Sequence, residues 1–202
     1  MRLKEEFRNE TVINKSRFIA CVKPCRTEEE CRAYIEEIRS EYSDATHVCT
    51  AYVTGENDRI QRSSDNKEPG GTAGVPMLEA IRHSGISSVC ACVVRYFGGI
   101  KLGAGGLIRA YSGAVTEALA KAQKTIDVTY HEYRIDYVYE LSGLMEGWLR
   151  KYTEVIDQQF DEKVHMFVLS EEELNEKIRN ISKGKAEIAF LKDVIREKDA
   201  EQ

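Results

Sequence analysis

The sequence predicts an α+β protein made of two units. Three observations support this fold class. Runs that alternate apolar and polar residues are interleaved with apolar stripes at helical spacing, one near-continuous apolar run precedes a glycine-rich segment and a long helical stripe, and the pattern starts again after Lys124. The 202 residues suffice for one large domain or two small ones, and we place the boundary between residues 1–130 and 131–202.

The first unit is expected to open with a strand pair and a helix. Residues 7–12 and 17–22 have the length and composition of paired strands. Thr27 and Glu30 have the spacing of a capping box, which satisfies free amide groups at a helix start. The expected buried face of this helix consists of Tyr34, Ile35, Ile38 and Tyr42.

A hairpin and a second helix are predicted next. Residues 47–54 alternate as a strand does, and a polar turn leads into a partner strand at residues 59–62. We expect Thr72 to cap the following helix, because Pro76 is tolerated only in the first turn, and we expect Gly85 to end it.

The centre of this unit is predicted to be a buried strand, a glycine-rich turn and a long helix. Residues 89–94 are apolar almost throughout, as in a strand that is covered on both faces. Glycines then cluster between residues 98 and 106, which indicates positive φ angles or a close approach of the backbone to another surface. The apolar stripe of the helix comprises Leu107, Ala110, Tyr111, Ala114, Val115, Ala118 and Leu119.

Beyond Lys124 the order of elements predicts a ferredoxin-like βαββαβ unit. The expected elements are a strand at residues 133–141, a helix at 144–152, strands at 154–160 and 164–169, a helix opened by a capping box at Ser170 and ended by Gly184, and a strand at 187–194.

Charge is distributed unevenly over a chain of formal net charge −5. Residues 1–124 contain 18 Lys and Arg against 16 Asp and Glu, whereas residues 125–202 contain 11 against 18. This argues against a wholly basic nucleic-acid binder. The excess of cations within residues 57–124 is compatible with a localised phosphate-facing surface, and a solvated charged face is the alternative.

Neither a membrane segment nor a cofactor or metal site is predicted. Residues 1–20 do not read as a secretory leader and no long apolar run follows, so we expect a cytoplasmic protein. The six cysteines lie mostly in apolar runs, and their Cys-x-Cys and Cys-x3-Cys spacings do not match structural zinc sites. Reduced, buried thiols are expected.

The strand-to-helix turn after residue 94 is the candidate binding surface. Amide groups at a helix start lack internal partners and carry partial positive charge, so with nearby cations they form an anion site. The residues that we assign to nucleic-acid or anion binding are Arg62, Lys67, Arg95, Tyr96, Phe97, Lys101, Gly105, Gly106 and Arg109. Exposed Tyr96 and Phe97 would stack on bases; in the alternative they complete the core and the glycines only permit tight packing.

Two segments resemble the signature blocks of the IMPACT/YigZ family. They are residues 63–76, which read SSDNKEPGGTAGVP, and residues 93–111, which read VVRYFGGIKLGAGGLIRAY. Asn66 and Lys67 stand where the family usually has Asp and Gly, which removes one carboxylate and one flexible glycine and adds a cation. The loop residues that carry the motif are Asp65, Glu68, Pro69, Gly71, Thr72 and Gly74.

The resemblance implies both a fold and a biological context. It implies a two-layer N-terminal domain similar to domain IV of elongation factor G and to a small-subunit ribosomal protein, followed by a domain similar to the last domain of that factor. Eukaryotic members modulate, by protein binding, a starvation-responsive kinase pathway that controls translation initiation. We therefore expect a non-catalytic, translation-associated protein with RNA or the ribosome as its partner, and with a protein partner in translation control as a further candidate.

Two catalytic alternatives remain. His47 and Cys49 share one face of a predicted strand, but parallel side chains at this spacing favour an ordinary strand face over a nucleophilic dyad. A small-molecule or nucleotide phosphate-binding enzyme would use the glycine-rich helix start, with Asp65 and Glu68 as its local acids. The glycine pattern matches neither a Walker A motif nor a dinucleotide fingerprint.

Overall fold

The computed structural model describes residues 1–200, and the chain divides into two compact units. The first comprises Met1–Ile126 together with Asp199 and Ala200, and the second comprises Asp127–Lys198. The boundary that we predicted after residue 130 lies inside β7 (Lys124–Tyr137), which continues from one unit into the other. Among the described residues, no helix has the length and apolar character needed to cross a bilayer.

A five-stranded sheet in the order β2-β3-β6-β4-β5 forms the first unit, and all neighbouring strands are antiparallel. β6 is central, as its near-continuous apolar run predicts. The strands are β2 (Phe7–Ile13), β3 (Ser16–Pro24), β4 (His47–Thr54), β5 (Ile60–Ser64) and β6 (Val89–Tyr96). A short β1 (Arg2–Leu3) pairs with the first residues of β7, and a 3-10 turn (Glu56–Asp58) joins β4 to β5.

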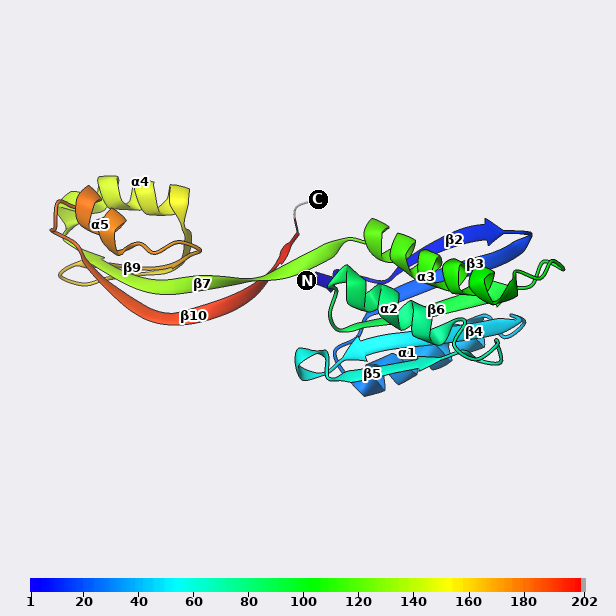
Figure 1. Cartoon of the computed structure of the whole chain (residues 1–202). Helices are drawn as coiled ribbons and strands as arrows, with labels where there is room; N and C mark the ends of the chain where they lie inside the picture. The colour runs from blue at the N-terminus through cyan, green and yellow to red at the C-terminus, as the bar shows by residue number, and fades with distance from the viewer. Residues whose placement is uncertain (201–202) are drawn as a thin grey trace. The chain divides into compact units, whose positions relative to one another are not determined.

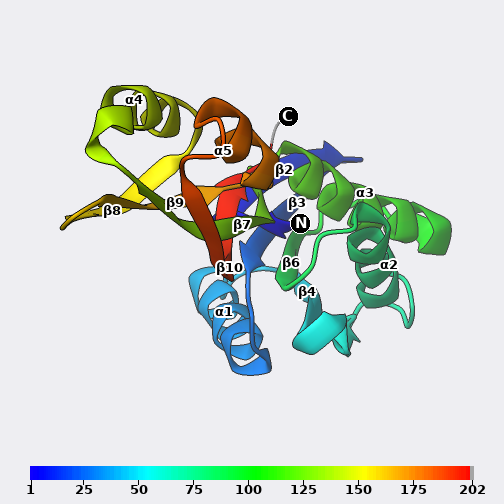
Figure 2. The same ribbon diagram turned by 90° about the vertical axis from the view of Figure 1, so that its left-hand side faces the viewer.

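Helices cover both faces of this sheet (Figures 1 and 2). On one face, α2 (Gly74–Ser84) and α3 (Gly103–Lys121) pack over a core that includes Phe18 and Tyr111. On the other face, α1 (Glu28–Glu41) buries Cys31, Tyr34, Ile35 and Ile38. The expectation of two layers is therefore wrong: β3, β4 and β6 are apolar on both faces, and each face needs a cover.

Local signals set most helix limits in this unit. The hydroxyl of Thr27 accepts the amide of Glu30 at 3.2 Å, as the capping box predicts, and Gly85 ends α2 in a left-handed conformation with φ 67°. Thr72, however, does not cap α2. Its hydroxyl donates to the carbonyl of Pro69 at 2.7 Å, and the helix begins two residues later.

The second unit has the predicted element order βαββαβ. After β7 come α4 (Ser142–Tyr152), β8 (Glu154–Phe160), β9 (Val164–Ser170), α5 (Asn175–Ile181) and β10 (Glu187–Asp199), with a 3-10 turn (Tyr139–Leu141) before α4. The spatial order of the strands is β10-β7-β9-β8, and α4 and α5 lie on one face of the sheet (Figure 1). The core between sheet and helices includes Tyr133, Ile135, Met145, Leu149, Met166 and Ile178.

Several boundaries in this unit differ from the prediction. β7 begins at Lys124 and β10 continues to Asp199, because the two strands pair with each other and their backbone bonds, not an apolar alternation, set their length. Ser170 does not cap α5. Its hydroxyl accepts the amide of Glu172 at 3.1 Å, whereas α5 begins only at Asn175.

A cluster of charged side chains surrounds His165 in the second unit. Its Nδ1 lies 2.6 Å from the carboxylate of Asp136, and its Nε2 lies 2.9 Å from that of Asp161. The guanidinium of Arg134 donates to Asp136 at 2.8 Å. Hydrogen bonds to the two carboxylates raise the pKa of His165 above its usual value.

This shift predicts a pH-dependent stability. Because the folded-state pKa of His165 is raised, its contribution is fully present below the unfolded-state pKa and is lost as the pH rises through the folded-state pKa. We expect the difference in urea midpoint between wild type and His165→Gln to be largest at about pH 5.5, where imidazoles are charged and carboxylates ionised, and to shrink toward about pH 8. His83→Gln, at an exposed histidine of α2, is the control. A difference that grows with pH contradicts the prediction.

Candidate functional site

The signature loop between β5 and α2 is held by the carboxylate of Asp65. Its oxygens accept the amides of Gly71 at 2.8 Å, Ala73 at 3.0 Å and Gly74 at 2.7 Å. Burial alone raises the pKa of this carboxyl group, but the three amide donors bring it below its usual value. Asp65 therefore takes the capping role that we expected of Thr72: its carboxylate places a negative charge at the start of α2.

Glu68 is a buried carboxylate that ties this loop to β6 and α3. Its side chain is only 3% exposed. Oε1 accepts a hydrogen bond from Nη1 of Arg95 at 2.5 Å and from the hydroxyl of Tyr111 at 2.7 Å, and Nε2 of His47 lies 3.8 Å away. Burial, followed by the neighbouring Cys49 and Glu68, raises the pKa of Tyr111, so this hydroxyl remains a donor at neutral pH.

Arg95 consequently does not belong to an exposed surface, contrary to the prediction. Its side chain is 6% exposed and its charge is neutralised by Glu68. The guanidinium carbon lies over the rings of Phe18 and Phe97, at 5.4 and 5.5 Å from their centroids. Arg95 is therefore an internal support of the glycine-rich turn.

Tyr96 and Arg62 lie on the opposite face of the sheet, which α1 covers. Successive side chains alternate along a strand, so Tyr96 points away from Arg95; its hydroxyl donates to Asp44 at 2.7 Å. Arg62 stands opposite Tyr52, which packs in the core under α1. The structure thus separates these two predicted binding residues from those on the α3 side.

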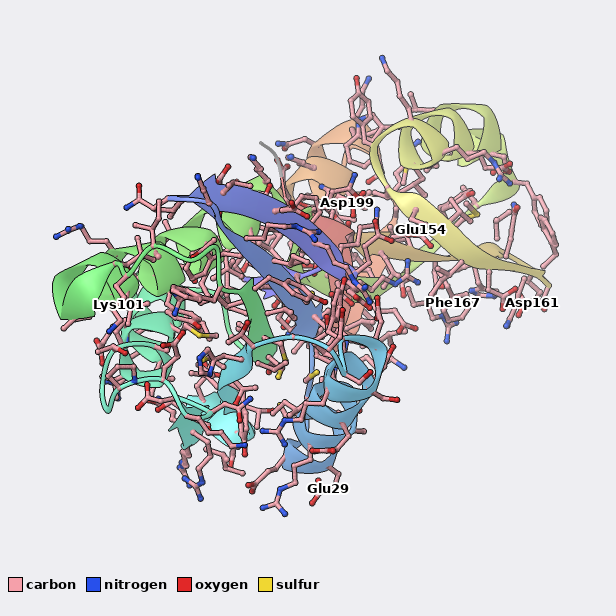
Figure 3. The ribbon with its side chains drawn as sticks, turned by 90° about the vertical axis from the view of Figure 1, so that its right-hand side faces the viewer. Glu29, Lys101, Glu154, Asp161, Phe167 and Asp199 are labelled. Atoms are coloured by element: carbon pink, nitrogen blue, oxygen red, sulfur yellow. The ribbon has the colours of Figure 1, made fainter. Side chains whose placement is uncertain are left out.

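Four exposed cations lie on segments that adjoin the glycine-rich turn, and we call them the basic surface: Lys15 on the hairpin turn against which Gly98 packs, Lys67 next to Glu68 in the signature loop, Lys101 just before α3, and Arg109 in α3. Within residues 1–200 none of the four forms an ion pair. Many other cations of this unit do, including Arg8, Arg17, Arg32, Arg39, Arg82 and Lys121. Lys101 lies at the N-terminal end of α3, well separated from Glu29 on α1 (Figure 3).

Lys15 was missed in the sequence. It follows Asn14 in a two-residue turn between β2 and β3, where both residues have positive φ, 46° and 63°. Gly98 packs on this turn: a Cβ at Gly98 would overlap the carbonyl group of Lys15, and the Gly98 amide donates to the hydroxyl of Ser16 at 3.2 Å. A short polar pair between two strand-like runs is the signal that could have revealed this turn.

The first turn of α3 carries no side-chain cap, in contrast to α2. Leu102 occupies the capping position, and its side chain offers no acceptor. Gly105 is exposed in this turn, and a Cβ there would meet only Nη1 of Arg109, at 3.7 Å. Gly106 is tighter, because its Cβ would lie 3.0 Å from Cβ of Leu102. The free amides and the basic surface together can hold an anion.

His47 and Cys49 bind different partners. Nδ1 of His47 lies 2.9 Å from the carbonyl oxygen of Asn66, whereas the Cys49 thiol donates to the carbonyl of Asp65 at 3.0 Å. Cys49 is fully buried, and burial raises its pKa to about 12, so the thiol is protonated at neutral pH. No three His, Cys, Asp or Glu side chains within residues 1–200 are grouped as metal ligands.

The two departures from the family motif have distinct structural effects. Nδ2 of Asn66 donates to the carbonyl of Val48 at 3.0 Å, a bond that an ionised Asp cannot make. Lys67 has φ 70°, the left-handed conformation that glycine adopts without strain. The loop therefore gains a bond at one position and accepts backbone strain at the next.

The sequence that forms this site matches the model of a known protein family. The model for the Impact N-terminal domain matches residues 14–119, which include the signature loop and most of α3. The chain belongs to the IMPACT family. The IMPACT family member YvyE of Bacillus subtilis is 54% identical over 117 residues, and the match spans 58% of this chain but only 54% of that protein. An IMPACT family member of Haemophilus influenzae is 39% identical over 162 residues, or 79% of each chain.

Solved structures also resemble this IMPACT family member. A crystal structure of a hypothetical protein, 30% identical, covers 95% of this chain and 96% of its own length with a TM-score of 0.59. The two-domain translational regulator Yih1 covers 57% of this chain at 23% identity, with a TM-score of 0.36. The first likeness extends over both units of the fold.

The buried position of Glu68 predicts a large cost for its removal. Glu68→Ala leaves the charge of Arg95 buried without its partner, and we expect a loss of roughly 3–5 kcal/mol in the free energy of unfolding measured with urea. Glu10→Ala removes the partner of exposed Arg17 and should cost at most about 1 kcal/mol. If both variants lose a similar amount of unfolding free energy, the large contribution predicted for the buried ion pair is wrong. For the same reason, charge reversal at Arg95 would disturb folding and is no test of binding.

Substituting alanine for two glycines of the turn should change stability in opposite directions. Gly98→Ala forces the backbone of Lys15 to move, so we expect it to lower stability by roughly 1–3 kcal/mol. Gly105→Ala places a methyl group in ordinary contact with Nη1 of Arg109 at 3.7 Å and should raise stability by about 0.5–1 kcal/mol, because alanine favours the helix more than glycine does. Thermal unfolding of both variants decides this; destabilisation by Gly105→Ala contradicts it.

Proposed function

We propose that this IMPACT family member is a non-catalytic, translation-associated binding protein. It contacts RNA, free or within the ribosome, through the basic surface and the first turn of α3. Arg95 supports this surface from within, and Tyr96 and Arg62 take no part in it. The translational context rests on family membership.

One observation carries the proposal: within residues 1–200, four exposed cations without acidic partners lie on segments that adjoin the start of α3, where the residue at the capping position, Leu102, offers no side-chain acceptor. In a chain of net charge −5, where most other cations of this unit are neutralised by carboxylates, such a group attracts phosphates locally. The free amides add directional donors for phosphate oxygens.

The alternative of a phosphate-binding enzyme receives less support. Such an enzyme needs carboxylates that are free to hold magnesium near the phosphates. Both acids of the loop are engaged elsewhere, Asp65 with three amides and Glu68 with Arg95 and Tyr111.

We also propose a fold name for each unit from its strand order and helix placement. The strand order β10-β7-β9-β8 with two helices on one face is that of a ferredoxin-like fold. For the first unit we retain the similarity to domain IV of elongation factor G and to a small-subunit ribosomal protein, with α1 as an additional layer on the sheet.

The proposal is tested by cosedimentation with ribosomes and by RNA binding across a salt series. We expect binding to weaken steeply with salt. Lys101→Glu with Arg109→Glu should lower affinity and flatten the log-log salt slope by about one unit for each phosphate that the variant no longer neutralises. Thermal stability should hardly change, because both side chains are exposed and form no ion pair within residues 1–200.

The matched control reverses Lys183 and Lys185, two exposed cations of the second unit, and so changes the net charge equally. It should bind as wild type does. Absence of wild-type binding to both ribosomes and RNA, or equal losses in the two double variants, contradicts the proposal. Ribosome binding that salt does not weaken would indicate a protein contact instead.

A further inference from the structure

Phe97 is exposed at the centre of the glycine-rich turn, although it directly follows the buried strand β6. Phe97 is 46% exposed, and Ile100 and Ile108, which are close to it in the sequence, are 43% and 41% exposed. Exposed apolar side chains that form a patch with a polar rim are typical of interaction surfaces.

The ring of Phe97 is fixed from behind. Its amide donates to the hydroxyl of Thr46 at 3.0 Å, and the guanidinium of Arg95 covers one ring face at 5.5 Å from the centroid. Arg95 is itself held by Glu68 at 2.5 Å. The ring therefore has a defined orientation before any partner arrives, which limits the entropy lost on binding.

The residues that follow Phe97 leave much of it accessible to solvent. Gly98 and Gly99 follow Phe97 and have no side chains that could cover it, and the close packing of Gly98 on Lys15 fixes the turn. Lys15 and Lys101 lie on the segments on either side of this turn and have no acidic partners within residues 1–200.

We infer that Phe97 is a stacking platform for an unpaired RNA base, so that the basic surface selects single-stranded RNA over duplex. This inference rests on the proposed function and adds the class of RNA. Single-strand sites combine an aromatic face for a base with cations that follow the backbone. Bases inside an A-form duplex are stacked on each other and inaccessible to such a ring.

A membrane surface fits this site less well. Interfacial binding relies on a helix with a broad apolar face, whereas the apolar stripe of α3 is buried in the core of the unit. A single ring backed by a cation and flanked by lysines matches one base with its two phosphates.

The test measures binding of the full chain to a labelled single-stranded RNA of about 12 nucleotides and to a duplex of about 12 base pairs, at one salt concentration. Phe97→Leu keeps apolar volume but loses the aromatic face, and Phe97→Tyr keeps the face. We expect Phe97→Leu to weaken single-strand binding roughly 5- to 100-fold and duplex binding less than about 2-fold, with Phe97→Tyr close to wild type. Urea unfolding of each variant checks the fold.

The outcomes separate this inference from the proposed function. If wild type binds RNA, and Lys101→Glu with Arg109→Glu weakens it while Phe97→Leu does not, the stacking inference fails and the proposed function stands. If Phe97→Leu loses affinity for single-stranded and duplex RNA equally, the stacking inference is also wrong. If wild type binds neither RNA but binds phosphatidylglycerol vesicles, and Phe97→Leu abolishes that binding, both the inference and the RNA proposal fail.

Discussion

One buried carboxylate connects the two signature segments of the first unit. Glu68 joins its loop to β6 through Arg95, which lies 27 residues away in sequence, and to α3 through Tyr111. Withdrawing two charges from water costs several kcal/mol per ion, which the close contact between Arg95 and Glu68 and the second hydrogen bond from Tyr111 offset. The residue types in the two segments therefore depend on each other, because Glu68 in the first needs Arg95 and Tyr111 in the second as its partners.

That internal network also decides which donors remain available outside. The carboxylate of Asp65 occupies the amides at the start of α2, and Glu68 neutralises Arg95, so neither presents its charge to a partner. Within residues 1–200 no comparable acceptor is recorded at the start of α3, and the cations of the basic surface lie on the segments that adjoin it. Two helix starts in one unit thus differ: side-chain oxygens of the chain itself satisfy the first, and the second is the one to which our proposal assigns a ligand.

The sequence predicts well what local patterns determine and poorly what strand order determines. The cap at Thr27, the end of α2 at Gly85 and the central strand follow from local chemistry and are confirmed. The opposite environments of Arg95 and Tyr96 do not, because they depend on which helix covers which face of a sheet whose neighbours are not consecutive in the chain. The same holds for Asp65, whose acceptor role spans nine residues of a loop.

In an acidic protein, a localised basic surface restricts the orientations in which a polyanion can bind. At physiological ionic strength the field of a charge is screened over about 8 Å, so the net charge of −5 acts weakly at a distance while unpaired cations act at contact. Surfaces whose cations are already paired offer a phosphate little gain. Under the proposed function, electrostatics therefore contributes the orientation of the encounter and the association rate more than the affinity. Affinity must come from contacts that only the correct orientation makes, such as those of a ring held rigidly beside the cations.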